Sequence, residues 1–350
     1  MWNFDTIHLE ITEKCNASCL QCGRNKNGGE VNQYLDNREL TLKDIQNVLD
    51  PERIKKLKKV YMCGNFGDPI AAKDTLKVFE YLRTNNPDMN LSMNTNGSLH
   101  NPTWWRKLVH LRVTVRFSID GLKDTNHIYR QNTDFDKIIE NAKAFIQDGG
   151  YAIWDYLVFG HNEHQVEEAR ELSEKLGFKQ FVAKKTGRFF SNSKTKGKES
   201  HTGLNKKSGE KIKIEKPKND KYKNKALEKE ELLVEQYGSL DNYLEQTDIA
   251  CKVYEREIYI SAEGLVLPCC WLADQLYKWY WPEKHAPIWK LIKDKRDINI
   301  KFHNLDEILN GETFNKIQES WHARSFKDGR LKVCALKCGK EFDPYSAQFE

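Results

Sequence analysis

Residues 6–22 read TIHLEITEKCNASCLQC, and this stretch decides the fold more than any other part of the chain. Its first half, Thr6–Thr12, alternates apolar residues with polar ones and predicts a β-strand. Its second half places Cys15, Cys19 and Cys22 in a C-x3-C-x2-C loop directly after that strand. Three thiolates suit a [4Fe–4S] cluster, because they leave one iron open for a small chelator. A zinc site completed elsewhere in the chain is the alternative.

Further strand-like runs and amphipathic stretches alternate along the first half of the chain. The runs that predict strands are Lys59–Cys63, Asn90–Thr95, Arg112–Ile119, Ala152–Phe159 and Gln180–Lys184. The stretches that predict helices include Thr75–Thr84, Phe135–Asp148 and His164–Leu176. Gly177 follows the last of these helices, where a C-cap glycine belongs. The alternation predicts an α/β fold with a parallel sheet, open or closed into a partial barrel, and ligands at the carboxyl ends of its strands.

The composition indicates the cellular compartment of the protein and the role of its cysteines. Hydrophobic residues make up 39% of the 350 residues and charged residues 31%, which is typical of a soluble globular protein. No run approaches the roughly 18 apolar residues of a membrane span, and the N-terminus lacks the features of a secretion signal. We therefore expect a cytoplasmic protein without a membrane partner, in which thiols stay reduced. The nine cysteines then indicate metal or iron–sulfur binding. Cys63 is an exception: it lies in an apolar stretch, and we expect it to be a buried core thiol.

A second set of cysteines lies near the end of the chain: Cys251, Cys269, Cys334 and Cys338. The first two belong to a C-x12-G-x4-C unit, whose Gly264 suits a tight turn between two strands over Glu257–Leu267. Four thiolates can ligate every iron of an auxiliary [4Fe–4S] cluster, and structural zinc is the alternative. Cys270 adjoins Cys269, so either residue can be the ligand.

The first cysteine loop resembles the signature of the radical S-adenosylmethionine (SAM) superfamily. The resemblance covers roughly residues 5–190 and implies a partial (β/α)6 TIM-like barrel whose [4Fe–4S] cluster binds SAM through the open iron. The residue before the third cysteine is usually aromatic in that family and is Gln21 here, a departure that concerns adenine packing. The C-terminal cysteines resemble the SPASM extension or its shortened twitch form, which implies a small α+β domain with one auxiliary [4Fe–4S] cluster.

Other motifs at the strand ends are similar to the SAM-binding segments of the family. The matching residues are Gly64, Gly67, Asp68 and Pro69 after the second strand, Asn94 and Asn96 at the third, Ser118 and Asp120 at the fourth, and Arg130 beyond it. By this resemblance the acid-Pro motif holds the SAM amino group, and Ser118 and Asp120 face its ribose or carboxylate. Arg130 is then expected to pair with the SAM carboxylate, as a fork-shaped donor can.

The basic charge of the protein is concentrated in one segment. Lys184–Lys225 contains fifteen Lys and Arg residues against four acidic ones, whereas the whole chain carries a net charge of +5. Within it, Ser191–Lys225 predicts a loop or disordered insert, which we expect to be a mobile or recognition element with no part in the radical chemistry. The expected domains are a radical SAM barrel over 1–190, an insert with a bridging helix over 191–247, and a twitch/SPASM-like domain over 248–350.

The resemblance implies an enzyme that reductively cleaves SAM to a 5′-deoxyadenosyl radical, which abstracts hydrogen from a substrate. The expected outcome is a two-electron oxidation of a peptide or protein side chain. A flavodoxin- or ferredoxin-type protein is expected to supply the electron that cleaves SAM. Alternatives are a small-molecule alcohol dehydrogenase of the twitch type and an RNA-modifying enzyme, the latter because clustered basic charge attracts phosphates. A non-catalytic electron-transfer or zinc-scaffold protein is the alternative outside enzymes.

Overall fold

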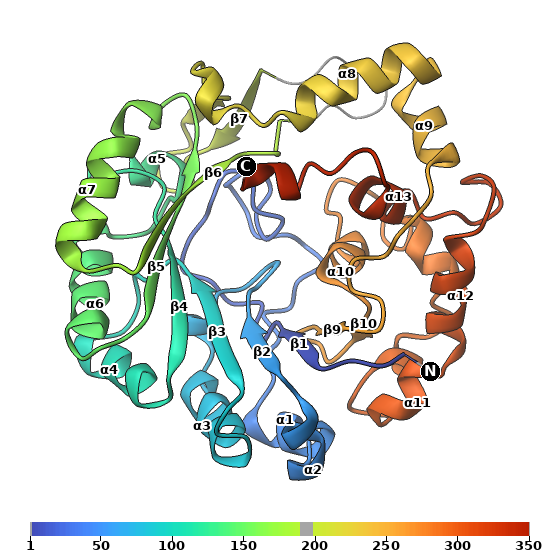
Figure 1. The fold of residues 1–350 in the computed structure, drawn as a ribbon, viewed down its shortest axis with the longest axis horizontal. Coiled ribbons are helices and arrows are strands. Elements are labelled where there is room, and N and C mark those ends of the chain that lie inside the picture. Colours follow the sequence, from blue (N-terminus) through green and yellow to red (C-terminus); the bar gives the residue numbers. More distant parts are fainter. Residues whose placement is uncertain (1, 190–198, 350) are drawn as a thin grey trace.

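The computed structural model describes residues 2–189 and 199–349, and its centre is a parallel β-sheet bent into an arc (Figure 1). Six strands form the arc in sequence order: β1 (Thr6–Leu9), β2 (Lys59–Met62), β3 (Asn90–Thr95), β4 (Val113–Ser118), β5 (Ala152–Val158) and β6 (Gln180–Lys185). Each pairs in parallel with the next. The predicted partial barrel is confirmed.

Helices cover the outer side of this arc (Figure 1). They are α1 (Leu42–Val48), α2 (Pro51–Lys56), α3 (Thr75–Asn85), α4 (Pro102–His110), α5 (Asn126–Tyr129), α6 (Phe135–Gln147) and α7 (Val166–Leu176). Side-chain caps from Asn101 and Asp134 begin α4 and α6, and Gly177 ends α7 with a φ of +87°. The three helices predicted from amphipathic stretches are therefore present within a few residues of their expected bounds.

The strands place apolar residues toward the helices and polar residues toward the interior of the barrel. In β4, Val113, Val115 and Phe117 are buried, whereas the alternate residues Thr114 and Arg116 are partly exposed. Burial of each apolar side chain contributes about 1.5–3 kcal/mol, so the alternation fixes which face of the strand meets the helices. The polar side chains are thereby directed into the space where ligands of such barrels bind.

The hairpin predicted within Glu257–Leu267 is present, and it extends the barrel sheet. Its strands are β9 (Glu257–Ile260) and β10 (Val266–Leu267), and Gly264 turns between them with a φ of +96°. β9 pairs in parallel with β1, so the sheet order is β10-β9-β1-β2-β3-β4-β5-β6. The C-terminal part is thus joined to the barrel by backbone hydrogen bonds, which the sequence did not indicate.

The remaining helices complete the C-terminal part and connect it to β6. They are α8 (Ala226–Tyr237), α9 (Leu240–Gln246), α10 (Cys270–Leu276), α11 (Leu305–Leu309), α12 (Glu312–Ser320) and α13 (Lys332–Cys338). Figure 1 shows α8 and α9 passing from the β6 side of the arc to the C-terminal helices. In the part of the chain that the structure describes, no helix has the length and apolar character needed to cross a bilayer.

The expectation of a loop or disordered insert over Ser191–Lys225 is corrected by the structure. Residues 191–198 lie outside the described residues, but beyond them β7 (Ser200–Leu204) and β8 (Lys211–Glu215) form an antiparallel hairpin. The sequence of β8, KIKIE, alternates in the way a half-buried strand requires, and its Ile214 is buried. The high lysine content obscured this short pattern.

Candidate SAM and iron–sulfur sites

The loop after β1 brings the thiols of Cys15, Cys19 and Cys22 to the carboxyl end of the sheet. The loop turns tightly, since the backbone N–H of Cys22 donates to the carbonyl of Cys19 at 3.1 Å. It is anchored to the segment around α5, because the N–H of Ser18 donates to the carbonyl of Gln131 at 3.0 Å. All three cysteines are free and partly exposed. The arrangement therefore presents three unpaired thiols from one ordered loop, which fits a cluster with one open iron.

Two arginines lie next to these thiols and offset the negative charge that thiolates would bring. Burial raises the pKa of Cys19 to about 11, while Arg130 and Arg188 act in the opposite direction. Arg188 donates to the backbone carbonyl of Gln21 at 3.3 Å and to the hydroxyl of Tyr129 at 2.6 Å. Arg188 was not predicted from the sequence, because it follows β6 in a segment without a recognisable motif. A cation beside the thiols supports binding of an anionic cluster there.

Asp68 connects the loops that follow β2 and β3. Its carboxylate accepts hydrogen bonds from the hydroxyl of Thr95 and the backbone N–H of Asn96, both at 2.8 Å, and from the side-chain amide of Asn96 at 2.7 Å. That amide also lies 3.8 Å from the sulfur of Cys15. Pro69 begins the short 3-10 helix beside Asp68. The two predicted SAM motifs thus lie together beside the cysteine loop, and the contacts of these residues with SAM stay a prediction.

The glycines of the loop after β2 are required by the protein backbone itself. A Cβ on Gly67 would lie 1.7 Å from the carbonyl oxygen of Thr12, and one on Gly64 would lie 2.1 Å from the carbonyl oxygen of Gly67. The family resemblance assigns these glycines to a SAM-binding segment. The neighbours that the structure gives them are backbone atoms, so their first role is to let the loop pack on the segment after β1.

Asp120 and Arg130 form a buried ion pair after β4. Arg130 Nε lies 2.6 Å from Asp120 Oδ2, with 18% of the arginine and 1% of the aspartate side chain exposed. The other oxygen of Asp120 accepts the backbone N–H of Leu157 at 2.7 Å. Ser118 ends β4 and is partly exposed, as is Asn94 within β3. Asp120 therefore holds Arg130 in place, and the contacts of both residues with SAM stay a prediction.

A second set of charged residues faces the barrel interior. Arg116 contacts both oxygens of Asp155, at 2.6 and 2.9 Å, and Lys184 contacts the same carboxylate at 2.6 Å. Two cations on one buried carboxylate leave an excess positive charge inside the barrel. Cys63, predicted as a buried core thiol, is partly exposed. The charges of Lys184 and Asp155 act on its thiol, so its surroundings are charged.

The four C-terminal cysteines surround one cavity. Its lining includes Cys251, Cys269, Cys334 and Cys338. The thiols of Cys251 and Cys338 form a hydrogen bond with each other. This bond stabilises the protonated form of Cys251 and so raises its pKa. Cys270 does not line this cavity, and its thiol is influenced by Cys63 and Glu257 on the barrel side. Space enclosed by four thiols is what a cluster needs, so the geometry favours Cys269 over Cys270 as the ligand.

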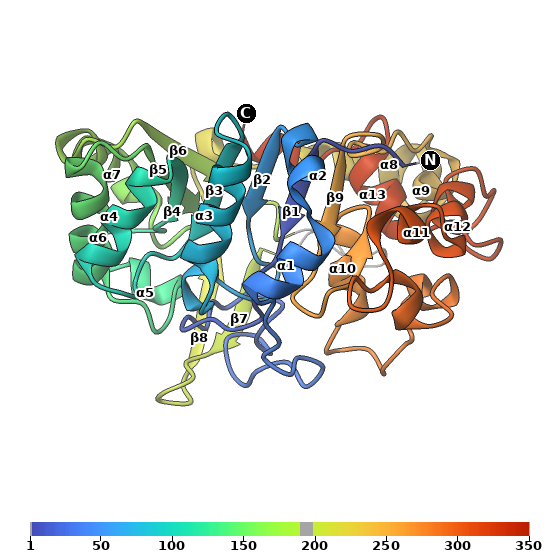
Figure 2. The ribbon, with the colours of Figure 1, turned by 90° about the horizontal axis from the view of Figure 1, so that it is seen from below.

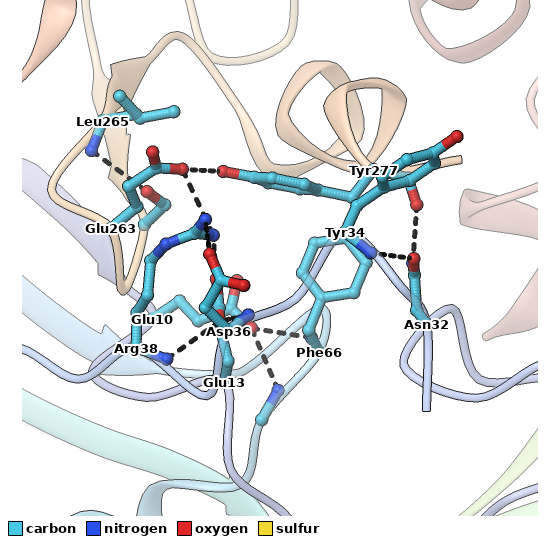
Figure 3. Close-up of polar contacts among 12 residues, drawn as sticks. Glu10, Glu13, Asn32, Tyr34, Asp36, Arg38, Phe66, Glu263, Leu265 and Tyr277 are labelled. Carbon is cyan, nitrogen blue, oxygen red and sulfur yellow. Dashed lines mark hydrogen bonds and ion pairs between the residues drawn. The ribbon is translucent and has the colours of Figure 1, made fainter. Parts of the chain in front are cut away.

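A polar network joins the cysteine loop to the C-terminal part (Figure 3). Arg38 bridges Glu13 at 3.0 Å and Glu263 at 3.4 Å. Asn32 donates to the backbone carbonyl of Tyr277 at 2.7 Å. These contacts fix the position of the first thiol set relative to the C-terminal part.

Among the described residues, no three His, Cys, Asp or Glu side chains converge closely enough to hold a single metal ion.

Glu10, at the end of β1, connects three segments. Its Oε1 accepts the backbone N–H groups of Phe66 at 2.6 Å and Gly67 at 3.1 Å, and its Oε2 accepts the hydroxyl of Tyr259 on β9. Complete burial raises the pKa of Glu10 to about 7. This carboxyl thus holds the loop after β2 against both β1 and the C-terminal hairpin.

Comparison with known proteins agrees with this geometry. Residues 9–173 match the sequence model of the Radical SAM superfamily, and residues 251–339 match that of the SPASM iron–sulfur cluster-binding domain. The chain is therefore a radical SAM protein with a C-terminal SPASM domain. Its cofactors are SAM and iron–sulfur clusters, and the two cysteine sets are the thiols available to hold the clusters.

Individual relatives are more distant. GTP 3′,8-cyclase from Desulforamulus reducens is 27% identical over 97 residues, which is 28% of this chain and 28% of that protein's length. Streptococcus suis SuiB bound to its precursor peptide SuiA has a TM-score of 0.57 and 15% identity, covering 99% of this chain and 76% of SuiB. The enzyme anSMEcpe with bound AdoMet and a Cp18Cys peptide has a TM-score of 0.54 and 14% identity, covering 98% and 94%. These structures share the fold.

Proposed function

We propose that this radical SAM protein oxidises a side chain of a peptide or protein substrate. The observation that carries the proposal is that β9 and β10 belong to the barrel sheet and lead directly to Cys269. The auxiliary thiols are therefore held at a fixed place beside the barrel, where an electron acceptor for the substrate is needed. The fold over nearly the whole chain is shared with structures that contain a precursor peptide or a Cp18Cys peptide.

In the proposed reaction the residues of this chain hold and orient the parts. When bound, the first cluster and SAM supply the 5′-deoxyadenosyl radical that removes a hydrogen atom from the substrate. Cys15, Cys19 and Cys22 would hold that cluster, and the loops ordered by Asp68 and by the Asp120–Arg130 pair would orient SAM. Exclusion of water from the bound site would protect a reactive species from stray hydrogen donors.

The electron balance assigns a role to the C-terminal thiols. Loss of a hydrogen atom leaves one unpaired electron on the substrate, and a closed-shell oxidised product forms only when that electron also leaves. Cys251, Cys269, Cys334 and Cys338 would hold the cluster that accepts it. The substrate thus loses two electrons in all, one with the hydrogen atom and one to the auxiliary centre. A proton released to solvent completes the loss of two hydrogens and leaves a neutral product.

The test uses anaerobically reconstituted full-length protein with SAM and dithionite, and candidate peptides encoded beside the gene. We expect 5′-deoxyadenosine by chromatography and a peptide that loses about 2 Da, or acquires the corresponding new bond. Replacing all three cysteines of the first loop with alanine should abolish both. No 5′-deoxyadenosine from the intact protein would refute the radical SAM activity. Oxidation of a small alcohol or of RNA, with every peptide unchanged, would refute the substrate class.

A further inference from the structure

The hairpin β7–β8 is bonded to the loop that carries the first cysteine set. The N–H of Leu204 donates to the carbonyl of Asn27 at 2.8 Å, and His201 Nε2 lies 3.2 Å from the carbonyl of Leu20, the residue after Cys19. A Cβ on Gly203 would lie 2.6 Å from the oxygen of Asn27, so the two backbones are in close contact. Figure 2 shows the hairpin and this loop projecting together from the same end of the sheet.

The tip of the hairpin carries exposed positive charge. Residues 205–218 contain six lysines and two glutamates, and most of these side chains are exposed. Lys213 and Lys216 have carboxylate partners at 2.7 and 2.5 Å. In the described part of the chain, Lys206, Lys207 and Lys211 have no carboxylate within 4 Å. These three lysines define the basic tip discussed below, and their charge is free to attract an acidic partner.

A surface hollow of about 510 Å³ lies between the basic tip and the cysteine loop. Its lining includes Asn16, next to Cys15, together with Asn205 and Lys207 of the hairpin. The rest of the lining is largely polar, from Ser98 to Asp134. A protein bound to the basic tip would therefore cover the surface directly above the loop that holds the first thiol set.

We propose that this surface is the docking site of an acidic one-electron carrier protein of the flavodoxin or ferredoxin class. The inference rests on the proposed function, because reductive cleavage of SAM consumes one electron that an outside donor must supply. The carrier would lose one electron and the centre held by Cys15, Cys19 and Cys22 would gain it, with no bond made or broken at the interface. Proximity favours this occupant over a peptide substrate, whose reacting side chain must reach the barrel interior instead.

Charge reversal at the basic tip tests the docking site. The variant combines Lys206→Glu, Lys207→Glu and Lys211→Glu, and the probe is a purified, net-negative flavodoxin. A matched control places the same change in charge on exposed lysines of outer helices: Lys56→Glu, Lys107→Glu and Lys143→Glu. Three readouts are compared: the Kd for flavodoxin without SAM at low and high salt, 5′-deoxyadenosine formation driven by reduced flavodoxin, and the same reaction driven by dithionite.

We expect the basic-tip variant to bind flavodoxin at least about tenfold more weakly and to lose most of the salt dependence. Its flavodoxin-driven rate should fall to a similar degree, while its iron content and dithionite-driven rate match those of the unmodified protein. The control variant should behave like the unmodified protein in all three assays. A milder variant with glutamine at the three positions should fall between the two.

Unchanged flavodoxin binding and rate in the basic-tip variant would overturn the docking site. The same holds if flavodoxin binding is unchanged but dithionite-driven turnover of a peptide falls, since the tip would then recognise substrate. Failure of the proposed function has a different signature: no SAM cleavage by the unmodified protein with dithionite. The binding measurement does not need SAM cleavage, so it decides the docking site in that case as well.

Discussion

Removal of Arg130 tests whether the buried ion pair with Asp120 holds the region after β4 together. The Asp120 side chain is 1% exposed, and its partner atom lies 2.6 Å away. Replacing Arg130 with methionine would leave a buried carboxylate with the backbone N–H of Leu157 as a remaining partner. Breaking a buried pair from one side costs about 3–5 kcal/mol. At about 2.1 cal/mol/K per residue of unfolding entropy, a chain of this length should lose roughly 4–7 °C in Tm.

The assay is thermal unfolding of the cluster-free protein without SAM, so that the result does not depend on cofactor binding. The double variant Asp120→Asn with Arg130→Met should recover most of the lost Tm, because it removes the uncompensated charge. Arg106→Met is the matched control. Arg106 pairs with Asp148 at 3.5 Å, with side chains 44% and 36% exposed, and such a surface pair contributes only about 0–1 kcal/mol.

Two results would refute this reasoning. A Tm loss in Arg130→Met no larger than that of Arg106→Met would show that the pair contributes little. Equal losses in the single and the double variant would show that the cost comes from packing of the arginine stem rather than from the charge of Asp120. In either case the charge of the Asp120–Arg130 pair would not be what holds this region together.

Three other predictions follow from the site. Cys269→Ser should reduce the iron content of reconstituted protein, measured by a colorimetric assay, from about eight to about four iron atoms per chain. Cys270→Ser should leave the iron content unchanged. Loss of iron in both variants would contradict the assignment of Cys269 as the ligand. Glu10→Gln should remove one contribution to the pH dependence of stability. The folded pKa of about 7 lies above the ordinary value, so the contribution of Glu10 is fully present below pH 4.5 and falls by about 3 kcal/mol as pH rises through 7. A constant Tm difference between the two proteins from pH 5 to 8 would contradict this. Gly67→Ala should prevent SAM binding or folding, because its Cβ would lie 1.7 Å from a backbone carbonyl oxygen, whereas Gly149→Ala meets open space and costs only the strain of its φ of +94°. Isothermal titration with SAM and circular dichroism distinguish these outcomes.

The sequence predicted those parts of the structure that depend on neighbouring residues. The C-x3-C-x2-C loop, the order of strands and helices and the C-cap at Gly177 are all local patterns, and the structure contains each of them. The motifs at the strand ends also lie together, because the carboxyl ends of parallel strands meet at one edge of a sheet.

What the sequence could not provide depends on contacts between distant residues. The pairing of β9 with β1 joins residues about 250 positions apart, and a strand pattern alone does not identify its partner. Cys269 and Cys270 are adjacent and chemically identical, so only the orientation that α10 imposes separates them. Arg188 lies in no motif, and the hairpin at Ile214 was obscured by the lysines around it.

The eight-stranded sheet holds the C-terminal thiol set in a fixed position relative to the first. Domains joined by a linker move relative to one another unless their interface is large, but here β9 hydrogen-bonds to β1 and Glu10 accepts the hydroxyl of Tyr259. Arg38 adds a second tie between the cysteine loop and the turn at Glu263. Under the proposed function, an electron that leaves a substrate in the barrel would meet an acceptor at a fixed distance, without a closing motion of the C-terminal part. Delivery of the first electron would, in contrast, need a separate partner. The proposed docking site for that partner, the basic tip beside the cysteine loop, lies away from the C-terminal helices (Figure 2).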